Sequence, residues 1–208
     1  MTMRTERNEF DLSYEGTPPW DIGRAQKEFV LLEERGEVKG SILDMGCGTG
    51  ENSLYFASRG HEVLGIDFSE IAIRKAQKKA QGRHLEHLSF RIADALNLSQ
   101  NLAGSSFDNV IDSGVFHVFT DDQRNKYVDN LQFVLKPSGK YFMLCFSELE
   151  PADWGGPRRI TKKEIETAFL RGWQINYFRD ARIETNFHQD GGKAWFISVS
   201  RLGESARS

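Results

Sequence analysis

Residues 41–52 read Ser-Ile-Leu-Asp-Met-Gly-Cys-Gly-Thr-Gly-Glu-Asn. An apolar run ends at Asp44, and three glycines follow at alternate positions, Gly46, Gly48 and Gly50. Glycine has no Cβ and permits positive φ, so the backbone can turn sharply and a ligand can approach it closely. The helical pattern behind the turn offers free N–H groups and a positive dipole end, which suit an anionic group. We predict a buried strand, a glycine turn and a helix N-terminus that together form a ligand site.

The spacing of the glycines argues against two other nucleotide sites. A dinucleotide fingerprint has its third glycine three places after the second, and that position is Glu51 here. The phosphate-binding loop that ends in Gly-Lys-Ser or Gly-Lys-Thr is not present in this stretch. A nicotinamide-dependent oxidoreductase is therefore disfavoured, although it remains an alternative.

Composition narrows the class of protein. The chain has 208 residues, of which 39% are hydrophobic and 27% charged, which is typical of one globular domain spanning residues 1–208. A formal net charge of −3 gives no electrostatic basis for binding nucleic acid. No apolar run approaches the ~20 residues of a membrane span. Cys47 and Cys145 have no metal-ligand partner at useful spacing, so we expect no metal site. We expect both cysteines to be reduced thiols in a cytoplasmic protein. We further expect a monomer or a weak homodimer.

Strand-like segments alternate with helical ones through residue 146. The strands are expected at 42–43, 61–66, 88–93, 107–111 and 140–146. Such alternation predicts a parallel sheet with right-handed crossovers. Two further β-like segments, 174–186 and 193–201, flank Gly191-Gly192 and are predicted to pair as a hairpin.

Helix starts and loops complete the expected organisation. Ser69 is a candidate N-cap, and Thr161 with Glu164 forms a capping box. Residues 1–19 are polar and are expected to be irregular, and residues 1–24 as a whole are expected to act as a flap or lid. Residues 203–208 are expected to be a frayed tail.

Four acids share one topological position, since Asp44, Asp67, Asp94 and Asp112 each follow one of the first four strands. Ligands of an open parallel sheet bind beyond the carboxyl ends of its strands. A single aspartate there is often only a turn former, but four are harder to explain in that way. Asp67 is placed to accept hydrogen bonds from both hydroxyls of a ribose, as carboxylates do in other nucleotide-binding sheets.

The Asp-x-Gly-x-Gly-x-Gly turn and the acids after the later strands resemble motifs I to IV of the class I S-adenosylmethionine (SAM)-dependent methyltransferases. Residues 18–24, 112–119 and 156–160 are similar to segments of its small-molecule group, which includes thiol, thiopurine and heterocyclic-toxin methyltransferases. The resemblance implies an α/β fold with a single Rossmann-like methyltransferase domain. Its seven-stranded, mostly parallel sheet has the order 3-2-1-4-5-7-6, with strand 7 antiparallel and helices on both faces.

The resemblance also implies SAM as cofactor and S-adenosylhomocysteine as product. Phe68 would cover the adenine, Asp94 would accept its amino group and the Ala95 N–H would donate to the ring. Asp44 would orient the glycine turn and the methionine amine, whereas Asp112 would either help to hold that amine or have a purely structural role. The predicted cofactor-binding residues are Trp20, Asp44, Gly46, Cys47, Gly48, Gly50, Asp67, Phe68, Asp94, Ala95 and Asp112.

We predict transfer of the methyl group, by in-line displacement, to the sulfur, oxygen or nitrogen of a small aromatic or thiol-type acceptor. His117 is the candidate general base, because its unperturbed pKa is near neutral, although a structural histidine is the commoner case. A non-catalytic SAM-binding regulator is the alternative within this resemblance. Predicted acceptor-site residues are Tyr14, Phe116, Arg158 and Arg159, with Phe119, Phe146 and Trp154 as further aromatic walls.

Overall fold

The computed structural model describes residues 3–151, 153 and 155–203, with side chains from residue 9 onward. One seven-stranded sheet has the order β3-β2-β1-β4-β5-β7-β6, and β7 runs antiparallel to both of its neighbours. The predicted strand order is thereby confirmed. The strands are β1 (Ile42–Met45), β2 (Val63–Asp67), β3 (Leu88–Ile92), β4 (Phe107–Ser113), β5 (Leu135–Phe146), β6 (Trp173–Ile183) and β7 (Gly192–Arg201).

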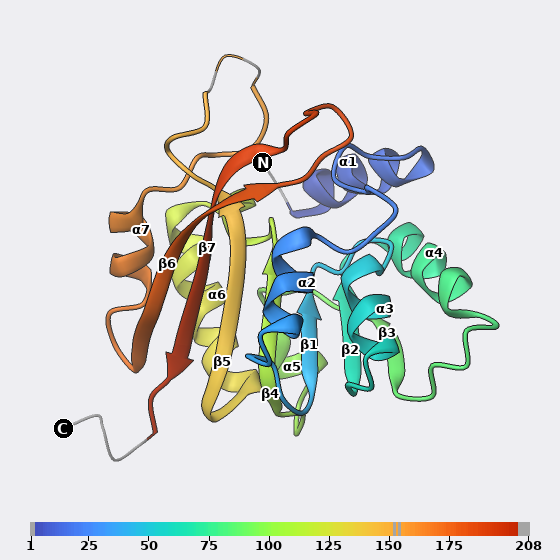
Figure 1. Ribbon diagram of the computed structural model, residues 1–208, viewed down its shortest axis with the longest axis horizontal. Coiled ribbons are helices and arrows are strands. Elements are labelled where there is room, and N and C mark those ends of the chain that lie inside the picture. The colour runs from blue at the N-terminus through green and yellow to red at the C-terminus, as the bar shows by residue number, and fades with distance from the viewer. Residues whose placement is uncertain (1–2, 152, 154, 204–208) are drawn as a thin grey trace.

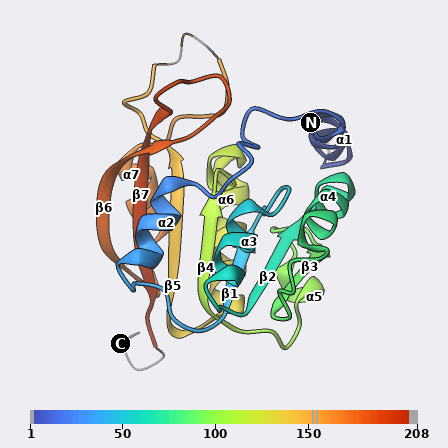
Figure 2. The ribbon, with the colours of Figure 1, turned by 45° about the vertical axis from the view of Figure 1, so that its right-hand side comes forward.

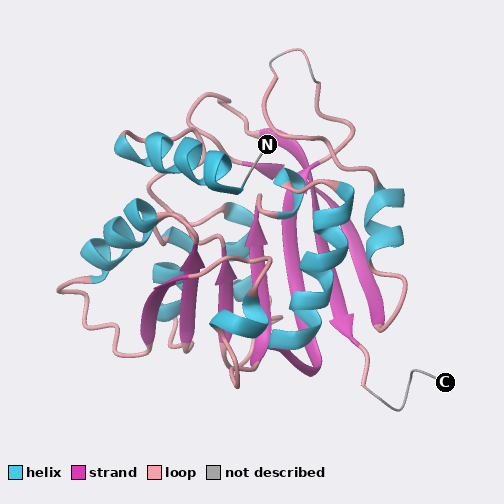
Figure 3. Cartoon of the chain, turned by 180° about the vertical axis from the view of Figure 1, so that it is seen from behind, coloured by secondary structure: helices cyan, strands magenta, loops and turns pink. Residues whose placement is uncertain are grey.

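Helices cover both faces of the sheet. In Figure 1, α2 (Lys27–Glu34) and α3 (Glu51–Ser58) lie in front of the strands. The view from behind in Figure 3 shows helices on the opposite face, where α5 (Leu98–Asn101), α6 (Asp121–Val134) and α7 (Lys162–Ala168) lie. The fourth helix, α4 (Glu70–Ala80), packs against β2 and β3.

Alternation along the strands divides the core into two layers. On β5, Tyr141 and Met143 point into the layer of α5, α6 and α7, whereas Phe142 and Leu144 point into the layer of α2 and α3. All four side chains are fully buried. Because successive residues of a strand face opposite sides, an almost continuous apolar run fits a strand covered on both faces.

Capping fixes where the helices begin after the strand ends. The Ser69 hydroxyl accepts a hydrogen bond from the Ala72 N–H, as the sequence predicts. Thr161 and Glu164 form the predicted capping box, with both reciprocal bonds present. These caps hold the helix N-termini close to the carboxyl edge of the sheet.

The prediction of an irregular N-terminus is wrong, because α1 spans Met3–Glu15. This helix lies above the carboxyl ends of the strands, close to α4 (Figures 1 and 2). Phe10 and Tyr14 are four residues apart and therefore share one helical face. That face packs on the carboxyl edge of the sheet. The apolar stripe is too short to be recognised in an otherwise polar sequence. Trp154 and residues 204–208 lie outside the described residues.

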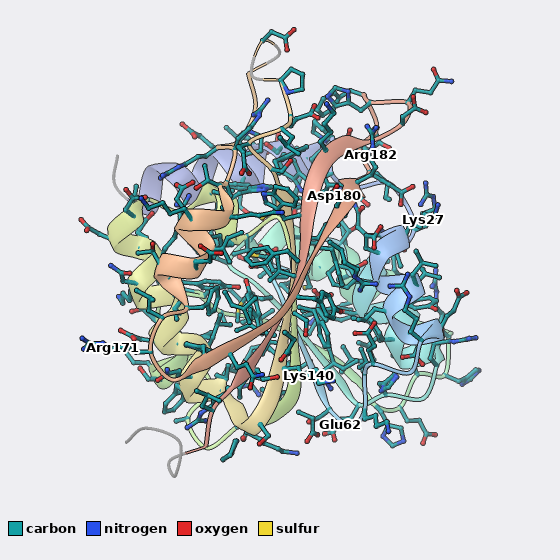
Figure 4. The ribbon with its side chains drawn as sticks, turned by 60° about the vertical axis from the view of Figure 1, so that its left-hand side comes forward. Lys27, Glu62, Lys140, Arg171, Asp180 and Arg182 are labelled. Atoms are coloured by element: carbon teal, nitrogen blue, oxygen red, sulfur yellow. The ribbon has the colours of Figure 1, made fainter. Side chains whose placement is uncertain are left out.

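The tip of the β6–β7 hairpin holds the segment that follows α1. Arg24 donates two hydrogen bonds of 2.8 Å to the two carboxylate oxygens of Glu184, and the Asn186 N–H donates to the Pro19 carbonyl at 2.8 Å. Arg182, labelled on β6 in Figure 4, donates to the Gly191 carbonyl and so closes the hairpin turn. The N-terminal segment is thus tied to the sheet edge beside α2.

Candidate cofactor and acceptor site

The glycine turn lies between β1 and α3 at the point where the strand order reverses. Gly46, Gly48 and Gly50 all have positive φ, at +63°, +53° and +87°. A Cβ at Gly46 would lie 2.2 Å from Val115 Cγ2, and one at Gly50 would lie 2.8 Å from Phe90 Cζ. These two glycines therefore allow the chain to pack on itself rather than giving a ligand room.

Gly48 differs because it lies beneath α1. A Cβ at Gly48 would lie 2.8 Å from the hydroxyl of Tyr14, which is itself buried. That hydroxyl accepts a hydrogen bond of 2.9 Å from Trp20 Nε1. The rings of Trp20 and Phe10 are 5.7 Å apart, and Trp20 remains 41% exposed. An aromatic cover from α1 and the following turn therefore lies over the glycine turn.

Asp67 links the end of β2 to this turn. Its Oδ2 accepts from the Gly48 N–H at 2.9 Å, and its Oδ1 accepts from the Ser69 N–H at 2.8 Å. Burial raises the pKa of Asp67 to about 6, although the backbone N–H groups oppose that shift. Among the described residues, the hydrogen bonds to this carboxylate come from backbone N–H groups, and ligand hydroxyls could take their place.

Asp44 lies at the carboxyl end of β1 and is also buried. The Ser53 hydroxyl of α3 donates to its Oδ2 at 2.6 Å. Burial raises the pKa of Asp44 to about 7, and the nearby Asp112 and Asp67 act in the same direction. This concentration of buried negative charge favours a cationic ligand at the switch point.

Asp112, at the carboxyl end of β4, is held by donors from the protein itself. Both Tyr127 and Tyr141 donate their hydroxyls to its Oδ2, at 2.8 and 2.7 Å. The N–H groups of Val115 and Phe116 donate to the same carboxylate. Four donors occupy this fully buried group, so the geometry favours an anchor for the 3₁₀ helix η1 (Phe116–Val118) over contact with the cofactor.

The predicted adenine-binding residues lie together at the ends of β2 and β3. Asp94 accepts from the Leu96 N–H at 2.8 Å and from Asn97 Nδ2 at 2.6 Å, and both Asp94 and Ala95 are half-buried. The half-buried Phe68 ring meets Phe10 edge to face at 5.4 Å. Their roles toward an adenine remain predictions, as does that of the half-buried Cys47.

His117 lies in η1 and is 5% exposed. Its ring stacks on Phe146 with centroids 5.3 Å apart, and its Nδ1 accepts from the Phe146 N–H at 3.3 Å. Burial lowers the pKa of His117 to about 3, and the charges of Arg124 and Arg159 act in the same direction. This environment does not favour the predicted general base, since the ring holds a proton weakly.

Two predicted acceptor residues lie in structural positions. Phe116 is fully buried and stacks on Phe169 with centroids 6.1 Å apart, so it forms part of the core rather than a pocket wall. Arg158 pairs with Asp121 and Glu164. Its contacts therefore join the 148–159 loop to α6 and α7 and do not favour binding of an acceptor.

Arg159 lies closer to the site. Its guanidinium is 5.7 Å from the centroid of the Phe146 ring, and it donates to the carbonyls of Pro157 and Pro151. Arg159 therefore folds the loop over the ring on which His117 stacks.

Sequence reasoning missed Arg124, the second cation beside His117. Its side chain is 4% exposed and pairs with Glu164 at 3.1 Å, while its Nε donates to the Phe116 carbonyl at 3.4 Å. Its Nη2 is buried and has no hydrogen-bond partner among the described residues. A single arginine in a helix belongs to no recognisable motif. The one signal in the sequence is its position, as the fourth residue of α6 and close to η1.

Metal and membrane features are absent from the part of the chain that the structure describes. Within it, no group of three or more histidine, cysteine, aspartate or glutamate residues is arranged to hold a metal ion. None of the described helices is both long and apolar enough to cross a bilayer.

Comparison with known proteins gives a consistent family. Residues 42–139 match the model of the methyltransferase domain. The 2-heptyl-1-hydroxyquinolin-4(1H)-one methyltransferase of Mycobacteroides abscessus is 33% identical, over 90% of this chain and 86% of that protein. The probable thiol methyltransferase 2 of Arabidopsis thaliana is 27% identical, over 74% of this chain and 68% of that protein.

A solved structure is similar over almost the whole chain. It comes from work on the conversion of a disulfide bond into a thioacetal group during echinomycin biosynthesis. It is 30% identical and has a TM-score of 0.86, covering 96% of this chain and 93% of the other. Both the sequence and the sheet topology therefore point to one family.

Proposed function

The chain belongs to the SAM-dependent methyltransferases, and from this premise we propose that it methylates a small aromatic or thiol-type acceptor. The family establishes SAM as the methyl donor and a small molecule as the class of substrate. The acceptor atom, sulfur, oxygen or nitrogen, and the roles of individual residues belong to the proposal.

The observation that supports this proposal is the buried Asp67 carboxylate bonded to the N–H of Gly48. The group is anionic, lies at the switch point and is held by backbone donors that a ligand can replace. Asp44, one strand away, adds a second buried acid. A cationic nucleoside fits this donor set, with Asp67 at its ribose and Asp44 toward its amine.

When bound, SAM supplies a methyl group on a cationic sulfonium. The chain's own residues bind, align and exclude water. Asp67 and the glycine turn fix the nucleoside, while Tyr14 and Trp20 cover the site from α1 and the following turn. Correct alignment removes several kcal/mol from a displacement barrier, so little further chemistry is required of the protein.

The acceptor class is supported by the relatives and by the aromatic side chains near η1. The names of the two relatives refer to a hydroxyquinolinone and to thiols. Phe146 stacks on His117 at the carboxyl end of β5, and Phe119 packs on Tyr127 at 5.0 Å. These rings favour a flat, mostly apolar acceptor.

A labelled-methyl screen tests the proposal. Purified protein is incubated with methyl-labelled SAM and panels of thiols, phenols, hydroxyquinolines and N-heterocycles, and label in the extracted product is counted. Transfer to at least one member, with S-adenosylhomocysteine formed in equal amount, is expected. Binding of S-adenosylhomocysteine by calorimetry without transfer to any panel would instead identify a regulator. Failure to bind it would remove Asp67 and the glycine turn from the proposal.

A further inference from the structure

His117 is held in one tautomer by the backbone. The Phe146 N–H donates to Nδ1, so the Nδ1 lone pair is engaged and the neutral ring must carry its proton on Nε2. To take up a further proton, the ring would have to become cationic and give up the bond from Phe146. The ring is therefore built as a hydrogen-bond donor at Nε2.

The donor edge of the ring lies at the switch point. A Cβ on Gly114, the residue after β4, would lie 3.2 Å from both Cε1 and Nε2 of His117. Gly114 is followed by Val115, whose methyl group occupies the space beside Gly46. The Nε2 edge of His117 thus lies next to Gly114, and Gly114 precedes Val115, the residue that contacts the glycine turn from the β4 side.

The charged groups that act on this ring are both cations. Arg124 of α6 reaches it from the core side, with its guanidinium 5.1 Å from the Phe116 ring centroid. Arg159 reaches it from the 148–159 loop, over the Phe146 ring. Two carboxylates lie near these cations, since Glu164 pairs with Arg124 at 3.1 Å and Asp112 accepts from the Phe116 N–H, but the net effect on the pKa of His117 is a lowering. This side of the site therefore presents an N–H donor and two guanidinium groups in low-dielectric surroundings.

Resting on the proposed function, we infer that this enzyme takes acceptors as anions and that His117 donates a hydrogen bond to them instead of acting as a base. The substrate class is an acidic aromatic thiol, phenol or N-hydroxy heterocycle. Its proton passes to water before binding. A lone pair of the acceptor anion then forms the bond to the methyl carbon, and the electron pair of the broken methyl–sulfur bond stays on sulfur. One anion and one cation become two neutral products, which the buried site favours.

Spectroscopy tests the ionisation state without any turnover. A nitrophenol or nitrothiophenol is titrated into protein saturated with S-adenosylhomocysteine, at a pH where the free compound is mostly neutral. We expect the bound chromophore to show its anion band, with its apparent pKa lowered by about one unit or more. A bound chromophore that keeps the neutral band would overturn the inference, even if the protein methylates other compounds.

Kinetics test the role of His117. With SAM saturating at every pH, acceptors whose solution pKa values span about five units should give acid limbs of kcat/KM that follow each acceptor's own pKa. Gln places an N–H near the position of Nε2 and cannot serve as a base, so His117→Gln should stay within about threefold of wild type. His117→Leu should fall by about tenfold or more, on the scale of losing a hydrogen bond to a charged group.

The opposite pattern identifies a general base. One acid limb shared by all acceptors in the wild-type enzyme, or equal loss in the Gln and Leu variants with unchanged S-adenosylhomocysteine affinity, would overturn the inference. The wild-type profiles decide the question by themselves if a variant does not fold. Failure of the proposed function has a separate signature, namely absence of labelled product.

Discussion

The two halves of the candidate site differ in the charged side chains that they contain. The cofactor half, at the ends of β1 and β2, contains the buried acids Asp44 and Asp67. The proposed acceptor half, around η1 and the end of β5, contains Arg124 and Arg159 beside a neutral His117, and its buried acid, Asp112, is held by four donors. A cationic donor and an anionic acceptor would each meet charge of opposite sign. Under the proposed function, recognition of the donor and of the acceptor is separated by charge along a single sheet edge.

The largest effect is expected from Asp67→Ala. Loss of the carboxylate should weaken SAM binding by roughly 2 kcal/mol or more, about thirtyfold, as for other hydrogen bonds to a charged group. Calorimetry with SAM and S-adenosylhomocysteine measures it. Asp108→Ala is the matched control, because that aspartate also accepts a backbone N–H but lies at the opposite end of the sheet. If folded Asp67→Ala binds SAM with the wild-type affinity, the Asp67 carboxylate does not contribute to cofactor binding.

The pH dependence of cofactor binding sharpens the same comparison. The folded pKa values of Asp44 and Asp67, about 7 and about 6, exceed the ordinary value of 3.8. Their contribution to stability of the unliganded protein is therefore full below pH 3.8 and is lost as pH rises through 6 to 7. A cationic ligand needs the ionised forms, so SAM affinity should rise about tenfold over the same window, with proton release.

Calorimetry in buffers of different ionisation enthalpy measures the released protons. Chemical denaturation of the unliganded protein at several pH values measures the opposing trend in stability. If the affinity for SAM does not change with pH over this range, neither Asp44 nor Asp67 interacts with the bound cofactor.

Gly48→Ala should have a smaller effect with two components. Positive φ strains an alanine by about 1 kcal/mol, and its Cβ would also push on the Tyr14 hydroxyl. Gly60→Ala is the matched control, because Gly60 has φ of +93° and a Cβ added there would meet nothing within 4 Å. Both variants should lose about 1 kcal/mol to the strained φ in thermal melts. Gly48→Ala should lose more because of the Tyr14 contact, and only Gly48→Ala should change SAM affinity. Identical affinities would show that Tyr14 leaves the turn when the cofactor binds.

The smallest effect is expected from Arg24→Ala, which removes the double hydrogen bond to Glu184. The side chain is 60% exposed, so we expect a loss of less than about 1 kcal/mol in the free energy of unfolding. Arg74→Ala, which breaks an exposed pair with Glu70 inside α4, is the control. A change in the KM of the acceptor only in Arg24→Ala would show that the hairpin tip helps to position the lid.

The sequence predicts the cofactor half better than the acceptor half for a physical reason. Glycines with positive φ and acids that follow strands leave a local pattern, and the topology then brings Asp44 and Asp67 together. Alternation of strands and helices predicts a parallel sheet, and the strand order follows from the family resemblance. Both features depend on residues close in sequence or on a fixed architecture.

The acceptor half depends on contacts between distant segments. Arg124 faces His117 only because α6 packs beside η1, and Arg158 is taken up by Asp121 and Glu164. Phe116 looks like a pocket residue in sequence, but the chain turns it inward on to Phe169. The helix α1 escapes sequence-based prediction because its apolar stripe is short and gains its stability from packing on the site.

The hairpin tip also bears on how the protein is made. Glu184 and Asn186 hold residues that precede them by 158 to 168 positions, including Gln26 and Pro18. During synthesis, the first helix and the turn after it emerge long before these partners exist. A ribosome-bound fragment that ends before β6 would therefore leave the aromatic cover without its tether, and the nascent chain should gain methyl-transfer competence only after its last hairpin has been released.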